Sequence, residues 1–476
     1  MRKIRSFIRK ETSFFLLLPL LALLFIPLAL WSESSFISKE FSEDIPSAVP
    51  FFRSIVLFTA LGGICFFFHY SPLPLLFRAD KEKRIELLVA VAFTLGFANL
   101  LFGFITSFIG QLLFFVIGLL IQAIHKIAQK KSPQFSPRVL LLAITFFLCY
   151  TTLSIFLAPD KTAAFSTFRL LIWLLVIPLL FSFYPFTKKT FQYFSRFTLG
   201  VGYIYLLAIG TLYVLVSLQY HSPLDAAFHL DKNYFYTAER IAYSPQLLLA
   251  NFGFNHYTFI TYLLFAPLAY SLVEDQSCTR RVSYTIGLLL FTHLLQCRLW
   301  IVTLPLLIGV AYLHRLKSHK LKILLFLAGL VALGVLGYIA YTAHLFEDTA
   351  RTTLLQIAFE KTKENVILGH GLATATPYLK SLGMWETHFH NSFVQVYFEM
   401  GLIGLLFTLS ILALYATVCV KRKNFAGVLL VLALIGLMTT DEIVNTTTLF
   451  LDVLLLTSLY LHPCGKQASC ALQKRI

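Results

Sequence analysis

Long apolar runs separated by short polar segments make up most of this chain. A helix of about 20 residues crosses a hydrocarbon core of about 30 Å, and many of the runs reach that length. They predict fourteen membrane-spanning helices, within a range of twelve to fourteen. The predicted spans are 13–31, 51–70, 85–102, 105–125, 139–157, 170–186, 198–218, 257–273, 282–296, 299–314, 323–342, 393–420, 425–440 and 446–461. We therefore expect an all-α polytopic membrane protein, with residues 1–476 forming a single transmembrane domain.

Composition supports this interpretation and excludes an ordinary soluble globular protein. The 476 residues are 58% hydrophobic and 13% charged, with a mean hydropathy of +0.77. Soluble domains carry about a quarter charged residues and under half apolar ones. The surplus of Leu, Phe and Ile is too large for any aqueous core of this chain to hold.

The net charge of +16 indicates membrane topology rather than binding to nucleic acid. Most of the 39 Lys and Arg residues fall between the apolar runs and on alternate sides of the predicted membrane. By the positive-inside rule the basic clusters face the cytoplasm, and so do both termini. The clusters cover residues 2–10, 78–84, 126–138, 188–196, 280–281, 315–322, 421–423 and the tail from 466. We expect membrane lipids as neighbours and no nucleic-acid partner.

Two outer loops are long enough to hold a functional site, one at 219–256 and a larger one at 343–391. Irregular backbone at a membrane surface can hold convergent polar groups. In the larger loop, residues 351–366 predict an amphipathic helix lying on the membrane face. Its apolar side is formed by Leu355, Ala358, Phe359 and Val366.

The predicted loop helix ends at Gly369-His370-Gly371. Glycine adopts positive φ angles without a steric penalty and leaves space beside the backbone. We therefore expect a turn here that a ligand can approach closely.

Among the histidines predicted on the outer side, His390 is the strongest candidate for a base. Imidazole accepts a proton near neutral pH. His390 opens a predicted helix, precedes Asn391 and shares a helix face with Gly401, which together with Gly404 would permit close helix packing. His388 and His390 could instead bind a metal, but zinc needs three or four protein ligands and no third one stands at suitable spacing.

Two arginines are candidate clamps for an anion. Arg298 interrupts a long apolar run, where a charge is costly unless it lies at the surface or faces a polar cavity. A guanidinium binds phosphate oxygens bidentately, although Arg298 could also extend to lipid headgroups. Arg351, at the start of the loop helix, could bind the same anion from the other side or be a solvated charge. Arg240 in the smaller loop and Glu399 in the twelfth span could line the cavity or serve only in packing.

Three segments in series resemble the signature of the O-antigen ligase and polymerase superfamily. They are Gly369-His370-Gly371-Leu372, His390-Asn391-Ser392-Phe393-Val394-Gln395, and Glu399-Met400-Gly401-Leu402-Ile403-Gly404-Leu405-Leu406. That family has a Gly-x-Gly-Leu turn in a large periplasmic loop, a His-Asn pair at the end of the loop, and Gly-Leu-x-Gly in the following helix. Arg298 and Arg351 match its two arginines, although Cys297 stands where Ser is common and Ile357 where an aromatic is frequent. The resemblance covers roughly residues 285–460.

The resemblance implies a metal-independent, inverting glycosyltransferase with a C-type glycosyltransferase-like fold and no cofactor. It implies work at the periplasmic face of the bacterial inner membrane, on a glycan donor carried by undecaprenyl diphosphate. By analogy His390 deprotonates the acceptor hydroxyl, while Arg298 and Arg351 bind the diphosphate and stabilise it as it leaves. Further expected substrate-binding residues are Asn391, His388, His370, Gly371 and Arg240.

The acceptor distinguishes the functions that remain open. A ligase transfers the glycan to a sugar of the lipid A core, whereas a polymerase transfers it to another carrier-linked repeat. We favour the ligase because the loop at 343–391 dominates and only three helices follow it, although two sizeable outer loops also suit a polymerase. A relative that glycosylates proteins is a further alternative.

A flippase or exporter of lipid-linked sugars would belong to a different class. Transporters tend to carry internal repeats and ionisable residues near the membrane midplane. This sequence shows no repeat, and its polar residues of interest lie at the outer surface.

Overall fold

The computed structural model describes the helical body and much of the larger loop. The described ranges are 75–77, 79–102, 108–130, 138–183, 187–220, 257–273, 278–294, 298–316, 349–384 and 388–439, then 454–459, with single residues elsewhere, among them 386, 461 and scattered positions at 318–334. These ranges are almost entirely helical and contain no strand. The predicted all-α fold is confirmed.

Most described helices coincide with the predicted spans. Their bounds are Lys81–Phe102 (α5), Phe108–Ala128 (α6), Arg138–Leu157 (α7), Lys161–Leu171 (α8), Trp173–Phe183 (α9), Lys188–Tyr220 (α10), Tyr257–Val273 (α14), Cys278–Leu294 (α15), Arg298–Arg315 (α16), Thr349–Thr362 (α18), Ala375–Ser381 (α19), Ser392–Lys421 (α20) and Phe425–Met438 (α21). The predicted span 13–31, nearly all of 51–70, and 221–256 of the smaller loop lie outside the described residues.

Several of these helices can cross a bilayer. In the described part of the chain, α5, α7, the segment Lys161–Phe181 and α20 are long and apolar enough to do so. Shorter apolar helices at Leu112–Ala128, Thr258–Val273, Val302–His314 and Phe425–Met438 accompany them. The protein is therefore a polytopic membrane protein.

Two predicted spans begin about ten residues earlier than their hydropathy indicated. The span predicted at 198–218 is α10, which starts at Lys188; the other span is the one before it. The pattern predicts a helix at 170–186, whereas α8 starts at Lys161 and passes into α9 at Ile172. Asp160 starts the helix, because its carboxylate accepts hydrogen bonds from the backbone N–H groups of Thr162 (2.9 Å) and Ala163 (3.0 Å). The charged residue Arg169 lowers the hydropathy of the first part of this helix, so the apolar pattern did not include it. In the structure the Arg169 guanidinium lies 5.9 Å from the ring centroid of Phe165.

Contacts between helix ends agree with the alternation of basic clusters along the chain. At one end, the Asn391 side chain donates to the carbonyl of Thr439 (3.0 Å), and both residues are predicted on the outer side. Pairs of residues near predicted cytoplasmic clusters also meet. These are Thr187 with Glu86 (2.7 Å), Arg422 with the Leu461 carbonyl (3.3 Å), and the stacked rings of His314 and Phe425 (3.8 Å between centroids). Which end faces the cytoplasm stays a prediction.

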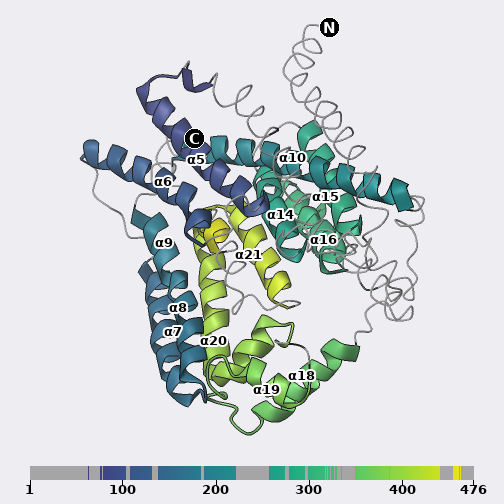
Figure 1. The fold of residues 1–476 in the computed structure, drawn as a ribbon. Coiled ribbons are helices and arrows are strands. Elements are labelled where there is room, and N and C mark those ends of the chain that lie inside the picture. The colour runs from purple at the N-terminus through teal and green to yellow at the C-terminus, as the bar shows by residue number, and fades with distance from the viewer. Residues whose placement is uncertain are drawn as a thin grey trace.

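Helix α20 connects the membrane body to the larger loop. In Figure 1 it rises from the region of α18 and α19 and runs beside α7, and α21 packs against α20, α14 and α16. A large apolar core joins the membrane helices. A second, smaller cluster, here called the loop core, lies between α18, α19 and the first turns of α20. Its buried members are Leu354, Ala358, Ala375, Leu379, Phe389, Val394 and Phe398.

Candidate active site

The buried side of α18 packs on α20 and matches the predicted side only in part, at Ala358 and Leu355. Leu354 and Ala358 are buried in the loop core, whereas Phe359 and Val366, expected on the apolar side, are 50% and 41% exposed. The helix also ends at Thr362, before the predicted end at 366. The predicted end of this helix is therefore wrong, and Phe359 and Val366 are not among the residues of the loop core. Contact of that face with the membrane stays a prediction. Packing against the first turns of α20 determines which side of α18 is buried.

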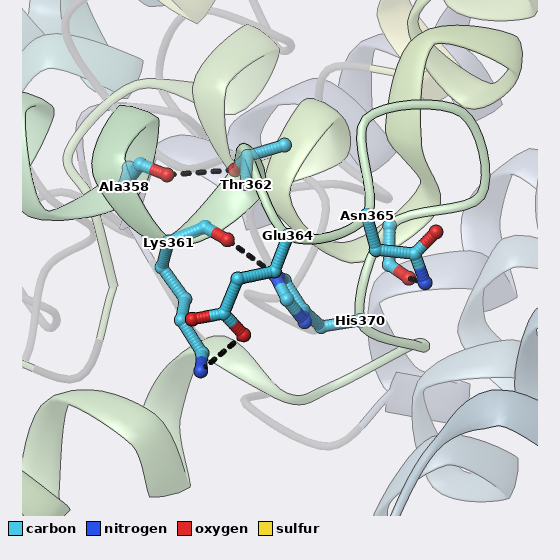
Figure 2. Close-up of polar contacts among 7 residues, drawn as sticks. Ala358, Lys361, Thr362, Glu364, Asn365 and His370 are labelled. Atoms are coloured by element: carbon cyan, nitrogen blue, oxygen red, sulfur yellow. Dashed lines mark hydrogen bonds and ion pairs between the residues drawn. The ribbon is translucent and has the colours of Figure 1, made fainter.

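Polar contacts close the turn that follows α18 (Figure 2). An imidazole nitrogen of His370, Nε2, lies 3.0 Å from the carbonyl of Lys361, and the Asn365 side chain donates to the carbonyl of Gly369 (2.6 Å). Lys361 also pairs with Glu364 at 2.6 Å. This hydrogen bond raises the pKa of Lys361 and lowers the pKa of Glu364, so both side chains are charged at neutral pH. The candidate substrate-binding residue His370 thus holds the end of α18.

The two glycines of the Gly-x-Gly turn adopt positive φ angles as predicted, +71° at Gly369 and +99° at Gly371. The space beside them is filled by protein backbone. A Cβ atom on Gly369 would lie 2.5 Å from the nitrogen of Gly401, and one on Gly371 would lie 2.4 Å from the nitrogen of Ala158. The space that glycine leaves beside the backbone is thus occupied by protein, and contact of Gly371 with a ligand stays a prediction. The absence of a side chain lets the backbone of α20 approach Gly369 and the backbone at the end of α7 approach Gly371.

Helix α20 is broken at Gly401, whose φ and ψ angles are 62° and −164°. Loop residues bind the backbone on both sides of the break, in an arrangement that we call the ladder. Its four hydrogen bonds run from His370 N to Phe398 O (3.0 Å), from Gly371 N to Glu399 O (2.8 Å), from Leu402 N to Val366 O (2.9 Å) and from Ile403 N to Ile367 O (3.4 Å). The expectation that His390 and Gly401 share one face of a continuous helix is therefore wrong.

The ladder replaces helical hydrogen bonds that the break removes. Unpaired backbone groups are costly in an apolar environment, so a broken membrane helix needs other partners. A further partner comes from α7, where the Tyr150 hydroxyl donates to the carbonyl of Met400 (2.8 Å). The carbonyls of three consecutive residues, Phe398 to Met400, are thus all bonded outside the helix.

Two buried polar side chains of α20, Gln395 and Glu399, connect the loop to the turn before the helix. The carboxylate of Glu399 accepts from the backbone N–H of Ala373 (3.0 Å) and of Ala375 (3.3 Å), and from the Gln395 amide (2.7 Å). The amide oxygen of Gln395 accepts from the N–H of Phe389 (3.3 Å). Sequence reasoning left Glu399 undecided and missed Gln395. The sequence does contain a signal for this pair, because two polar residues one helical turn apart in a largely apolar helix lie on the same face and can bond to each other.

His390 occupies a strained turn directly before α20. Its φ angle is +50°, in the left-handed region that residues other than glycine adopt at a cost of about 1–3 kcal/mol. Its ring centroid lies 4.2 Å from that of His388. Asn391 caps the helix, because its side-chain oxygen accepts from Phe393 N (3.0 Å) and Val394 N (3.1 Å). With its amide bonded to the Thr439 carbonyl as well, Asn391 holds the turn rather than presenting free groups to a ligand.

Of the three candidate arginines, Arg351 is the one whose side chain belongs to the described residues. Arg351 lies one turn before Leu354 on α18, on the helix that packs against the His390 region. Arg298 is the first residue of α16, as predicted; its side chain lies outside the described parts. Arg240 also lies outside them. In the described ranges, no group of three or more His, Cys, Asp or Glu residues could hold a metal ion.

Comparison with known families adds an independent finding. Residues 283–409 match the family model described as O-antigen ligase. The matched segment contains Arg298, Arg351, both sides of the ladder and the His390 turn. A comparison with curated proteins found no significant match.

Proposed function

We propose that this chain, whose residues 283–409 match the O-antigen ligase family, transfers a glycan from undecaprenyl diphosphate to a sugar hydroxyl of the lipid A core. The reaction would take place at the periplasmic face of the bacterial inner membrane, without a metal ion or other cofactor. The family match supports a glycosyltransferase of the ligase or polymerase type. The choice of the lipid A core rests on the dominance of the loop at 343–391.

The observation that carries the proposal is the His390 turn. Strained backbone concentrates at functional sites and persists only where its surroundings hold it. Here Asn391 fixes the turn to α21 on one side, and Gln395 fixes it to the loop through Phe389 on the other. A base at the outer end of a membrane helix, rigidly held in this way, suits an acceptor that comes from solvent and a donor that comes from the bilayer.

We propose that His390 removes the proton of the acceptor hydroxyl. The acceptor oxygen then forms a bond to the anomeric carbon of the donor sugar, and the bond from that carbon to the diphosphate oxygen breaks. The proton remains on the imidazole, and the diphosphate leaves with its electron pair. Arg298 and Arg351 would stabilise the charge on the departing diphosphate. A single displacement of this kind inverts the anomeric configuration.

The other candidate residues take different roles in this proposal. Asn391, His370 and Gly371 position the backbone, because their polar groups or their lack of a side chain serve contacts inside the protein. His388, whose ring lies tilted beside that of His390, is the remaining candidate to contact the acceptor. Arg240 stays a candidate contact from the smaller loop.

A transfer assay with purified protein tests this function. It combines carrier-linked glycan with a lipid A-core acceptor and compares wild type with His390→Ala and Arg298→Ala, each with and without a chelator. Lys363→Ala is the matched control, since Lys363 is exposed and pairs with the exposed Glu360 at the end of α18. We expect chelator-resistant transfer by wild type and the control, and loss of transfer in both site variants.

Two other outcomes would support the alternative functions, a polymerase or a transporter. Chain growth from carrier-linked repeats, without transfer to the lipid A core, would make the protein a polymerase. Movement of intact lipid-linked sugar across the bilayer without either reaction would refute an enzymatic function.

A further inference from the structure

We infer that the turn at 366–368 dips into the bilayer, so that Val366, Ile367 and Leu368 contact phospholipid acyl chains in the leaflet next to α18 and α19. These three consecutive apolar side chains are 41%, 60% and 40% exposed. Exposed apolar groups in a row mark a surface that something apolar covers. This inference does not depend on the proposed function.

The turn at 366–368 lies beside Tyr150 of α7. The carbonyl of Leu368 lies 3.5 Å from the hydroxyl of Tyr150. Residues at positions −4, +3 and +7 from Tyr150 share its helix face. They are Phe146, Leu153 and Leu157, which are 56%, 62% and 45% exposed. The apolar surface of α7 therefore continues past the turn in both directions.

Tyr150 lies about two helical turns before the predicted outer end of α7. Leu157 is seven positions after Tyr150, which corresponds to about 10 Å at a helical rise of 1.5 Å per residue. The first charged residues follow only at Asp160 and Lys161. If the exposed Leu153 and Leu157 face lipid, as expected for a membrane-spanning helix, the turn beside Tyr150 lies at the depth of the acyl chains.

Helix α20 supplies the same apolar continuity on the other flank. The ladder joins Val366 to Leu402, which is 43% exposed, and Leu406 and Leu409 follow on the same face at 53% and 45%. The turn thus lies between two apolar helix surfaces. Phospholipid is the occupant that this continuity favours, because the same acyl chains would cover all three surfaces.

The backbone of the turn is compatible with an apolar environment. Irregular backbone is tolerated at membrane depth when its polar groups are bonded within the protein. The carbonyls of Val366 and Ile367 accept from Leu402 N and Ile403 N in the ladder. Just before the turn, Lys363 and Glu364 are exposed, as residues at the headgroup level would be.

Tryptophan fluorescence in lipid vesicles tests the inference. The Ile367→Trp variant of the full chain is reconstituted in phosphatidylcholine vesicles with ordinary or brominated acyl chains. Wild type, read in parallel, supplies the signal of the four native tryptophans. Glu360→Trp is the matched control. Glu360 lies on α18, in the helix just before the turn, and 72% of its side chain is accessible. We expect the emission added by Trp at 367 to be blue-shifted and mostly lost in brominated lipid, and the emission added at 360 to be unaffected.

Two results would overturn the inference. Red-shifted emission at 367 that aqueous acrylamide quenches would place the turn in water. Blue-shifted emission that brominated lipid leaves intact would show that protein, rather than lipid, covers the turn. Val366→Trp, checked for a monodisperse profile by size exclusion, provides a second reading if Ile367→Trp fails to fold.

Discussion

Replacing Gly401 by alanine tests the role of the helix break most directly. The φ and ψ angles of Gly401 (62°, −164°) fall in a region that is essentially restricted to glycine. A Cβ atom there would lie 2.2 Å from the carbonyl oxygen of Ile367, and Cβ atoms essentially never approach backbone so closely. The alanine variant must therefore change its backbone angles and displace the turn at 366–368.

The expected cost follows from these two effects. The unfavourable backbone angles contribute about 1–3 kcal/mol. Displacing the turn breaks the hydrogen bonds from Leu402 N and Ile403 N, each with a net value of about 0.5–1.5 kcal/mol. The sum is on the order of 2 to 6 kcal/mol, a large loss for a folded protein.

Two other glycines provide matched controls. Gly383 has a φ of +73° but open space around it, so alanine there should cost only the backbone term of about 1–2 kcal/mol. Gly309 lies in α16, where a Cβ atom would have no neighbour within 4 Å, and alanine there should stabilise the helix by about 0.5–1 kcal/mol.

The assay is thermal unfolding in detergent, scored as the fraction that stays monodisperse after heating for a fixed time. We expect midpoints in the order Gly309→Ala at or above wild type, then Gly383→Ala, then Gly401→Ala lowest. A Gly401→Ala midpoint equal to that of Gly383→Ala would refute the reasoning, because it would mean that the ladder adds nothing beyond local strain.

Three further predictions follow from the same region. Glu399→Gln replaces an acceptor oxygen by a donor among three donors and should cost about 1–3 kcal/mol, visible as a lower thermal midpoint together with slower transfer. Asn391→Ala removes the helix cap and the hydrogen bond to Thr439, which should cost about 0.5–2 kcal/mol of stability and lower kcat more than it changes KM for the donor. Asn391→Asp keeps the capping oxygen and should retain most of the stability. The lowered pKa of Glu364 means that its pair with Lys361 stabilises the fold at neutral pH and is lost as the pH falls below the ordinary carboxyl value of 4.5; Glu364→Gln should therefore flatten the acid limb of a plot of midpoint against pH.

Much of the membrane body was predictable because hydropathy reports directly on burial in lipid. The spans at α5, α7, α14, α16 and α21 needed only the length of each apolar run. The positive φ angles of Gly369 and Gly371 were also predictable, because a pair of glycines at a helix end favours a left-handed turn.

The break in α20 was not predictable from local pattern. Gly401 stands in a long apolar run, where a glycine is as compatible with close helix packing as with a break. Its conformation depends on hydrogen bonds to residues 366 and 367, which are distant in the sequence. The buried face of α18 depended on tertiary contacts in the same way, because Leu354 and Phe359 are both large apolar residues, yet Leu354 is buried in the loop core and Phe359 is 50% exposed.

The ladder also explains how a loop can hold reactive groups in a fixed position relative to a membrane helix. Sliding the loop along α20 would unpair the carbonyls of Phe398 and Glu399 and the buried Glu399 carboxylate together, at about 1–3 kcal/mol for each unsatisfied group. The loop core adds apolar contacts between α18 and Phe389, next to His390. Arg351 on α18 and His390 before α20 are therefore carried by elements that cannot move independently. Under the proposed function, a site assembled in this way would be preorganised before substrate binds, so the free energy of substrate binding would not be consumed in ordering the loop.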